Sequence, residues 1–152
     1  ASDVYKRQGK ESCEMIVQTQ TTSFKAELYQ GIHDLTTDTL KLALYTASAN
    51  LDASTTVYTT SNEITGTGYT AGGKIVTGAA ISSSGYTAWV TFNNVIWTPA
   101  AFTTRCALLY NASKANRSIA VLDFGSDKTC TTTFTVVMPG DTATTALIRS
   151  SN

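Results

Sequence analysis

The side chains that could do chemistry are few and scattered along this sequence. His33 is the single histidine, and it stands beside Asp34 near the end of an expected helix. A histidine-dependent nucleophile would also need a serine on a sharp turn of the Gly-x-Ser-x-Gly kind, and no such motif occurs. We therefore interpret His33 as a solvated residue at a helix end, and we expect its replacement by alanine to leave stability unchanged.

Paired carboxylates are the second source of chemistry. Hydrolysis of a glycosidic bond needs an acid and a partner carboxylate on facing elements, and the sequence offers Glu63 with Asp123 or Asp127. Asp34 with Asp38, or Asp123 with Asp127, could bind Ca²⁺, but neither pair has the ligand spacing of a calcium loop. Turn and edge positions explain these residues better, so we predict no enzyme, no catalytic residue, no metal and no cofactor.

A glycine-rich segment is the most specific feature of the sequence. Residues 66–73 read Gly-Thr-Gly-Tyr-Thr-Ala-Gly-Gly and superficially resemble a phosphate-binding loop. Such a loop leads into a helix and ends in Lys-Ser or Lys-Thr, whereas here Lys74 is followed by Ile75 in a strand pattern. We expect a looping connection in which glycine permits unusual backbone angles. The candidate residues of a binding or assembly loop are Gly66, Gly68, Tyr69, Gly72 and Gly73.

Aromatic residues could provide a platform on which sugar rings stack. Aromatic side chains also dominate the cores of β-sandwiches, however, and we expect core packing for most of the candidates. These candidates are Tyr58, Tyr69, Tyr86, Trp89, Trp97 and Tyr110.

The three cysteines, Cys13, Cys106 and Cys130, are too scattered for a zinc site or a disulfide framework. Cys106 and Cys130 both fall in expected strands and could be neighbours. The alternatives are a bridge between them or two free thiols, and we favour the free thiols.

Strands must position almost all of these residues. More than two dozen threonines and a charged fraction of only 14% favour strands over a helical bundle. Only residues 22–35 show a helical period, with Phe24, Leu28 and Ile32 on one face. Expected strands lie at 40–44, 74–81, 86–92, 95–97, 102–110, 118–124, 131–138 and 146–149, with turns at 82–85, 93–94, 111–116 and 125–128.

These strands predict an all-β fold. Short, evenly spaced strands favour a β-sandwich, with the jelly roll as one form of it, and one short helix near the N-terminus. Leu42 and Val136 are each at the centre of an alternating apolar face, so we expect both in the core.

The first residues do not follow this pattern. Residues 1–8 match the translation of a transposase adapter used in shotgun sequencing, as in metagenomic work. We therefore expect residues 1–14 to be adapter-derived or disordered and dispensable for folding. Residues 15–152 would form a single β-sandwich domain.

The charge balance disfavours two classes of partner. Eleven basic and eleven acidic residues cancel, whereas a protein that binds nucleic acid needs a basic stripe. No apolar run is long enough for a transmembrane helix. A neutral surface with few charges is permissive for self-assembly.

Several stretches resemble a group of small tailed-bacteriophage proteins of the virion, of the capsid-decoration or head–tail structural kind. They are residues 23–28 with Gly31, then 40–45, 58–73, 107–111 and 121–125. The likeness runs from Ser23 to Arg149, and residues 66–73 are its most specific piece. The resemblance implies a phage context and carries over no catalytic motif.

We therefore expect a virion structural protein that acts by self-assembly. Its partners would be copies of itself, with a closed trimer as the favoured order, and other virion proteins, with no nucleic acid and no membrane. The alternative is a receptor- or glycan-binding module of a phage tail that recognises a host-surface glycan, and the third hypothesis is a small hydrolase. Tyr69 is the residue expected to separate assembly from glycan binding.

Overall fold

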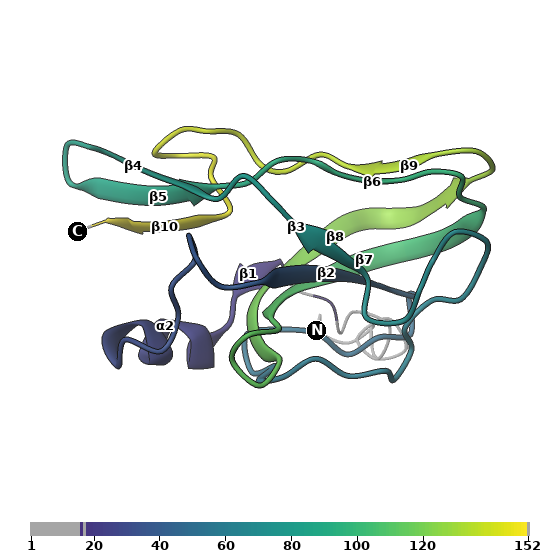
Figure 1. Ribbon diagram of the computed structural model, residues 1–152, viewed down its shortest axis with the longest axis horizontal. Coiled ribbons are helices and arrows are strands. Elements are labelled where there is room, and N and C mark those ends of the chain that lie inside the picture. The colour runs from purple at the N-terminus through teal and green to yellow at the C-terminus, as the bar shows by residue number, and fades with distance from the viewer. Residues whose placement is uncertain (1–15, 17, 152) are drawn as a thin grey trace, which may run out of the picture.

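The largest sheet is built from the most apolar stretches of the chain. The computed structural model describes residue 16 and residues 18–151 and shows five antiparallel strands in the order β1-β8-β7-β2-β3 (Figure 1). Their bounds are β1 Thr19–Gln20, β8 Arg117–Cys130, β7 Phe102–Asn111, β2 Leu40–Tyr45 and β3 Lys74–Val76.

A second layer covers one face of this sheet. It consists of the ladder of β6 (Val95–Trp97) with β9 (Phe134–Val136), and of a sheet in the order β10-β5-β4. The bounds of the latter are β10 Ile148–Ser151, β5 Thr87–Thr91 and β4 Ala80–Ser84. The two small sheets lie end to end, and the three-stranded one extends beyond the large sheet (Figure 1). We call the three-stranded sheet the wing, and the five-stranded sheet with β6 and β9 the body.

The layers enclose the main core, as expected for a sandwich. Leu42, fully buried on β2, and Val136 on β9 both belong to it, which confirms both core predictions. Trp97 of β6 is also buried there and lies edge-on to Phe102, with ring centroids 6.5 Å apart. The structure is thus an all-β sandwich with one short helix.

The other face of the large sheet is buried as well. Ala43 and Tyr45 of β2 point to this outer face and form a second cluster with Leu51 and Tyr110. The cover comes from the first part of residues 46–73, a stretch without a named helix or strand that contributes Ala49, Leu51 and Tyr58 to this cluster. Because both faces are buried, β2 and β7 carry nearly continuous apolar runs instead of strict alternation.

The helix is shorter than the sequence pattern predicts. Helix α2 spans Thr22–Tyr29, and the Thr21 side chain caps it by accepting a hydrogen bond from the Phe24 backbone N–H. The predicted end at residue 35 is wrong because Gly31 adopts a φ of +72° and turns the chain away. Phe24 is buried against the body, whereas Leu28 is exposed.

Several predicted turns are also wrong. Residues 74–81 divide into β3 and the start of β4, and β4 continues through Ser84, so the predicted turn at 82–85 moves to Gly85 and Tyr86. Residues 125–128 belong to β8, whose pairing with β7 is interrupted by a register shift after Asp123 and resumes from Lys128 to Cys130. Asn93 and Asn94 do not close a hairpin, because β5 and β6 lie in different sheets.

Two remaining predictions concern the cysteines and the N-terminus. Cys106 and Cys130 are free, as favoured, and Cys106 stands opposite Asp123 in the ladder of β7 and β8. The prediction for residues 1–14, and Cys13 with it, lies outside the described residues.

Candidate functional site

The glycine-rich segment is packed tightly against the body. Gly68 and Gly73 have φ angles of +86° and +79°. A Cβ atom at Gly68 would overlap the carbonyl oxygen of Pro99, and one at Gly73 would overlap that of Leu42. Gly66 is similarly close to Phe102, whereas Gly72 is buried without such an overlap. These glycines therefore allow close approach of two backbones.

Tyr69 holds this segment from within. Its hydroxyl accepts a hydrogen bond from the Leu44 backbone N–H at 3.0 Å and donates one to Glu63. Its ring packs near Trp97 and Phe102, with centroids 6.3 and 6.0 Å away. Burial first, and then the hydrogen bond to Glu63, raise the pKa of Tyr69, so the hydroxyl remains a donor.

Glu63 is the centre of the surrounding hydrogen bonds. One carboxylate oxygen accepts from Tyr58 Oη at 2.7 Å, and the other accepts from the Gly72 N–H at 2.7 Å and from Tyr69. Tyr110 donates to the Gly72 carbonyl oxygen at 2.6 Å. A carboxylate with three donors already in place is suited to fixing the segment rather than to transferring protons.

The segment therefore brings its five predicted residues together, but its glycines and Tyr69 are directed at the body. The side chains that it exposes are small, namely Thr67, Thr70 and Ala71. A role for residues 66–73 in assembly or binding stays a prediction. Tyr69 cannot separate the two hypotheses, because its removal would disturb the fold.

The histidine occupies a different environment from the predicted one. His33 is buried, its Nε2 lies 2.8 Å from Glu27 Oε1, and its Nδ1 lies 3.0 Å from Asn111 Nδ2. Glu27 also accepts from Arg117 Nη1 at 3.0 Å. The interpretation as a solvated helix-end residue is wrong, because the chain after α2 folds back over β7 and β8 and brings the imidazole between polar partners.

Asp38 extends this polar network. It accepts from Asn111 Nδ2 at 2.7 Å, from the Asp34 backbone N–H at 3.0 Å and from Lys114 Nζ at 3.0 Å. Burial opposes ionisation of Asp38, but these donors outweigh it and lower its pKa to about 2. The network of Glu27, His33, Asp38, Asn111, Lys114 and Arg117 thus ties α2 and the following loop to the turn between β7 and β8.

The predicted acidic pairs have other partners. Asp34 accepts hydrogen bonds from Thr36 within its own turn, and Asp123 lies 3.4 Å from Arg105 Nε. Asp127 is exposed on β8. Within residue 16 and residues 18–151, no three His, Cys, Asp or Glu side chains form a group that could hold a metal ion.

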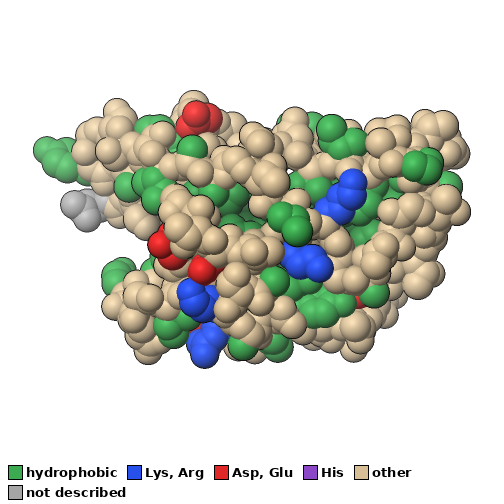
Figure 2. Space-filling model, in the orientation of Figure 1, with side chains coloured by type: hydrophobic (Ala, Val, Ile, Leu, Met, Phe, Trp, Pro, Cys, Tyr) green, Lys and Arg blue, Asp and Glu red, His purple; other side chains and the backbone are tan. Residues whose placement is uncertain are grey.

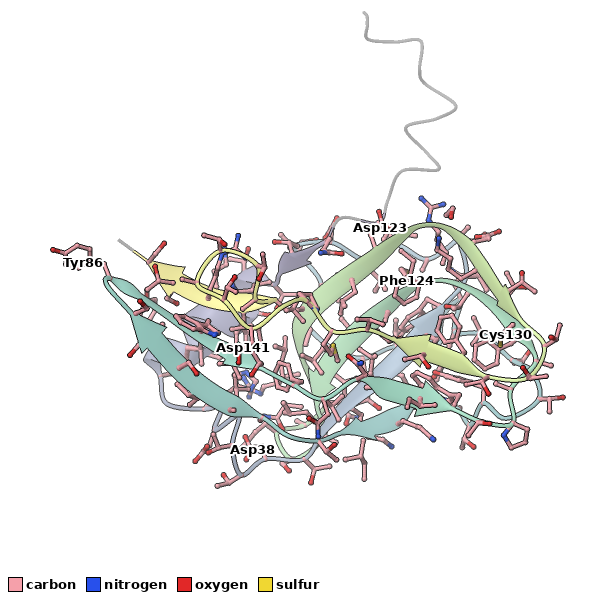
Figure 3. The ribbon with its side chains drawn as sticks, turned by 90° about the horizontal axis from the view of Figure 1, so that it is seen from above. Asp38, Tyr86, Asp123, Phe124, Cys130 and Asp141 are labelled. Carbon is pink, nitrogen blue, oxygen red and sulfur yellow. The ribbon has the colours of Figure 1, made fainter. Side chains whose placement is uncertain are left out.

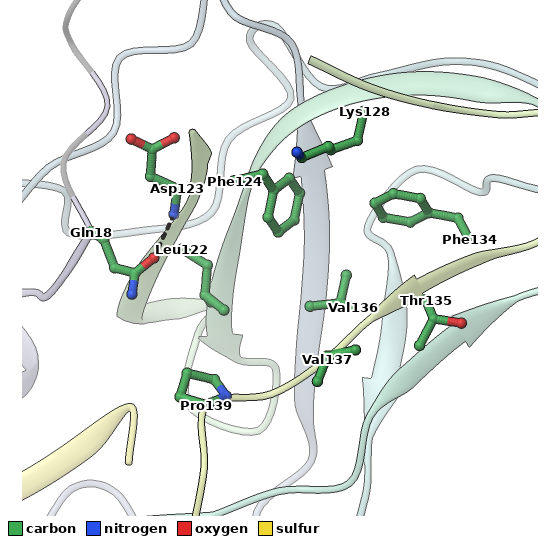
Figure 4. A pocket seen from close by; sticks show the side chains of 10 residues that line it. All are labelled: Gln18, Leu122, Asp123, Phe124, Lys128, Phe134, Thr135, Val136, Val137 and Pro139. Carbon is green, nitrogen blue, oxygen red and sulfur yellow. Dashed lines mark hydrogen bonds between the residues drawn. The ribbon is translucent and has the colours of Figure 1, made fainter. Parts of the chain in front are cut away.

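An apolar groove opens between β8 and β9 (Figure 4). It has a volume of about 420 Å³ and is lined chiefly by Leu122, Phe124, Phe134, Val136 and Val137. The neighbouring edge of β8 is already capped. The Asp123 N–H donates to Gln18 Oε1 at 3.0 Å, and the Gly125 N–H donates to Asp123 Oδ1 at 2.9 Å. The capped N–H groups make this edge unsuited to pairing with a further strand.

One long side of the molecule, in contrast to the capped edge of β8, presents edge strands with exposed apolar side chains. The edge strands β3, β4 and β6 all lie along it, as Figures 1 and 3 show together. Each carries one exposed isoleucine: Ile75 is 58% exposed, Ile81 64% and Ile96 47%. Figure 2 shows hydrophobic side chains scattered over this side, with several charged side chains among them. We call the side formed by β3, β4 and β6 the edge-strand surface.

Most of the predicted aromatic platform is structural. Tyr58 stacks on Tyr110 with centroids 4.7 Å apart, and Trp89 Nε1 donates to Asp141 Oδ1 at 2.7 Å. Tyr86 alone among the six candidates is highly exposed. Tyr29 is exposed too, and the sequence analysis did not identify it. Its position could have indicated exposure, because it follows Leu28 and so lies off the helix face that Phe24 and Leu28 share.

Comparison with protein-family models, curated proteins and solved structures found no match. In the described part of the chain, no helix is long and apolar enough to cross a membrane.

Proposed function

We propose that this protein is a structural subunit of a tailed-phage virion that works by binding copies of itself. The edge-strand surface is the observation that carries self-association. The phage context is supported by the sequence resemblance of residues 23–149.

Open strand edges are normally protected in monomeric proteins. Charged side chains, proline, bulges or a covering loop prevent pairing with other chains. Here Lys74 is the charged side chain on β3, and its Nζ donates to the Ile96 carbonyl oxygen at 2.6 Å, so it bridges to β6. Each of the three strands still exposes one isoleucine that a neighbouring subunit could cover.

The composition of the chain supports the same proposal. Equal numbers of basic and acidic residues and a charged fraction of 14% provide little electrostatic repulsion between copies. A stable interface buries roughly 800 Å² on each partner. The long side formed by the wing, β3 and β6 offers a surface that spans both parts of the molecule (Figure 1).

Light scattering at micromolar concentration tests the proposal. We expect the wild-type mass to be a multiple of the chain mass, with a closed trimer as the favoured order. Replacing Ile81 and Ile96 together by lysine adds charge to two of the edges and should reduce the mass to that of one chain.

Val57→Lys is the matched control. Val57 is 46% exposed, close to the value for Ile96, but lies in the segment that covers the outer face of the large sheet. This variant should keep the wild-type mass. A wild-type mass of one chain would refute self-association, and dissociation by Val57→Lys alone would place the interface elsewhere.

A further inference from the structure

Two tyrosines differ from every other described aromatic residue. Tyr29 is 94% exposed and Tyr86 is 84% exposed, and they are the only aromatic residues among the exposed large hydrophobic side chains of residues 16 and 18–151. Tyr29 ends α2, and Tyr86 is at the tip of the turn between β4 and β5 (Figure 3). A single exposed ring needs no explanation, but two exposed rings at one place on the surface make a candidate ligand contact.

Both tyrosines line the same hollow. It has a volume of about 430 Å³ and lies between the end of α2 and the tip of the wing. Among the residues that the structure describes, the remaining lining is small and rich in hydroxyl groups and contains no charged side chain: Ser83, Gly85, Thr87, Ala88, Ser150 and Ser151. Two elements that are far apart in the sequence thus place their exposed rings at one uncharged hollow.

These side chains match the chemistry of a sugar. A pyranose ring presents C–H groups on its faces, which pack on aromatic rings, and hydroxyl groups around its edge, which exchange hydrogen bonds with serine and threonine. A phosphate or a carboxylate would need a cationic side chain in the lining, and none of the described lining residues is cationic.

Cationic residues begin only at a neighbouring hollow. Lys25 and Arg149 line it together with Tyr29 and Ser150. The Arg149 guanidinium already donates to the Ala146 carbonyl oxygen at 2.8 Å. An acidic glycan would bind towards this neighbouring hollow rather than between the two tyrosines, which makes charge a useful variable in the test.

The wing holds the hollow in a defined shape. β10 pairs with β5 from Ile148 to Ser151, and Gln20 Nε2 donates to the Arg149 carbonyl oxygen at 3.2 Å, which links the wing to β1. Gly85 supports the turn with a φ of +59°. Sites on such elements are better defined than sites on long loops.

We infer that the hollow between Tyr29 and Tyr86 binds a neutral glycan through stacking on the two rings. This activity goes beyond self-association, since it uses side chains at the tip of the wing rather than the isoleucines of the edge-strand surface.

A glycan array tests the inference with the full chain. The probes are uncharged hexose and N-acetylhexosamine oligosaccharides, printed beside matched glycans that carry uronic or sialic acid. We expect binding to one or more neutral glycans. Tyr29→Ala and Tyr86→Ala should each weaken it by about tenfold or more, whereas Tyr86→Phe, which keeps the ring, should change it by less than about threefold.

The controls separate binding from folding and assembly. Both tyrosines are exposed, so their alanine variants should keep the wild-type melting temperature and the wild-type mass in light scattering. The Ile81 and Ile96 lysine variant tests the assembly proposal independently. Absence of binding to every neutral glycan, binding to acidic glycans alone, or binding that persists in both alanine variants would overturn the inference.

Discussion

The body and the wing bury their side chains very differently. On β7 of the body, Phe102, Thr104 and every residue from Cys106 to Asn111 are buried. On β4 of the wing no residue is buried, and its sequence is Ala-Ile-Ser-Ser-Ser. The wing is anchored by a few residues only, chiefly Trp89, Val90 and Ile148.

This difference shows how the chain separates stability from surface function. The body places large apolar side chains on both faces of one sheet, which supplies most of the hydrophobic stabilisation. The wing relies on its backbone ladder and its anchors, so its remaining side chains are free to contact other molecules. Sites for assembly and binding are therefore expected on the wing and at its junction with the body.

The largest predicted contrast is between Leu42 of the body and Tyr86 of the wing. Leu42→Ala should cost about 2–5 kcal/mol of unfolding free energy, because it leaves a cavity in the core. Tyr86→Ala removes a larger side chain but should cost less than about 0.5 kcal/mol, because the ring is exposed. Urea denaturation of both variants checks this. Equal losses would mean that the wing is packed like the body.

An intermediate effect is expected at the polar network beside α2. His33→Ala removes one hydrogen-bond partner each from Glu27 and Asn111 at a buried position, so it should cost about 1–3 kcal/mol, contrary to the expectation from sequence. Gln30→Ala, exposed at the end of the helix, is the control. The same denaturation experiment applies, and a His33→Ala variant as stable as the control would show that the network does not fasten α2 to the body.

The smallest effect is the pH dependence contributed by Asp38. The pKa of Asp38 is lowered to about 2, so its ionised form stabilises the fold above its usual pKa, and this contribution is lost as the pH falls towards 2. Asp38→Asn should lower the melting temperature by roughly 2–4 °C at pH 7. The gap should close between pH 4 and pH 2. A constant gap over that range would show that the charge of Asp38 is not responsible.

The sequence predicted the fold class because local patterns were sufficient for it. Leu40, Leu42 and Leu44 do share the core face of β2, and Val136 is buried as expected. Turn residues were misleading where tertiary pairing was stronger. Gly125 suggested a turn, and with a φ of +82° it does lie at a register shift, but pairing with β7 resumes at Lys128 and the chain continues as β8.

The site was less predictable, because it depends on which segments meet. Nothing in the sequence around His33 or Asn111 indicates that His33 Nδ1 lies 3.0 Å from Asn111 Nδ2. The glycine-rich segment was identified correctly as a loop, but its contacts with Pro99 and Leu42 follow from the tertiary fold. Tyr29 and Tyr86 are far apart in sequence, and only the position of α2 below the wing brings them to one hollow (Figure 1).

The pairing of the covering layer also determines when the protein can fold during synthesis. β6 receives its partner from residues 134–136, and β5 receives β10 from residues 148–151. In a nascent chain that has not reached these residues, β6 lacks its partner β9 and β5 lacks its partner β10, so the core is incompletely covered. Closure of the sandwich therefore has to wait for residues 134–151, and folding dominated by such distant pairings is expected to take milliseconds to seconds.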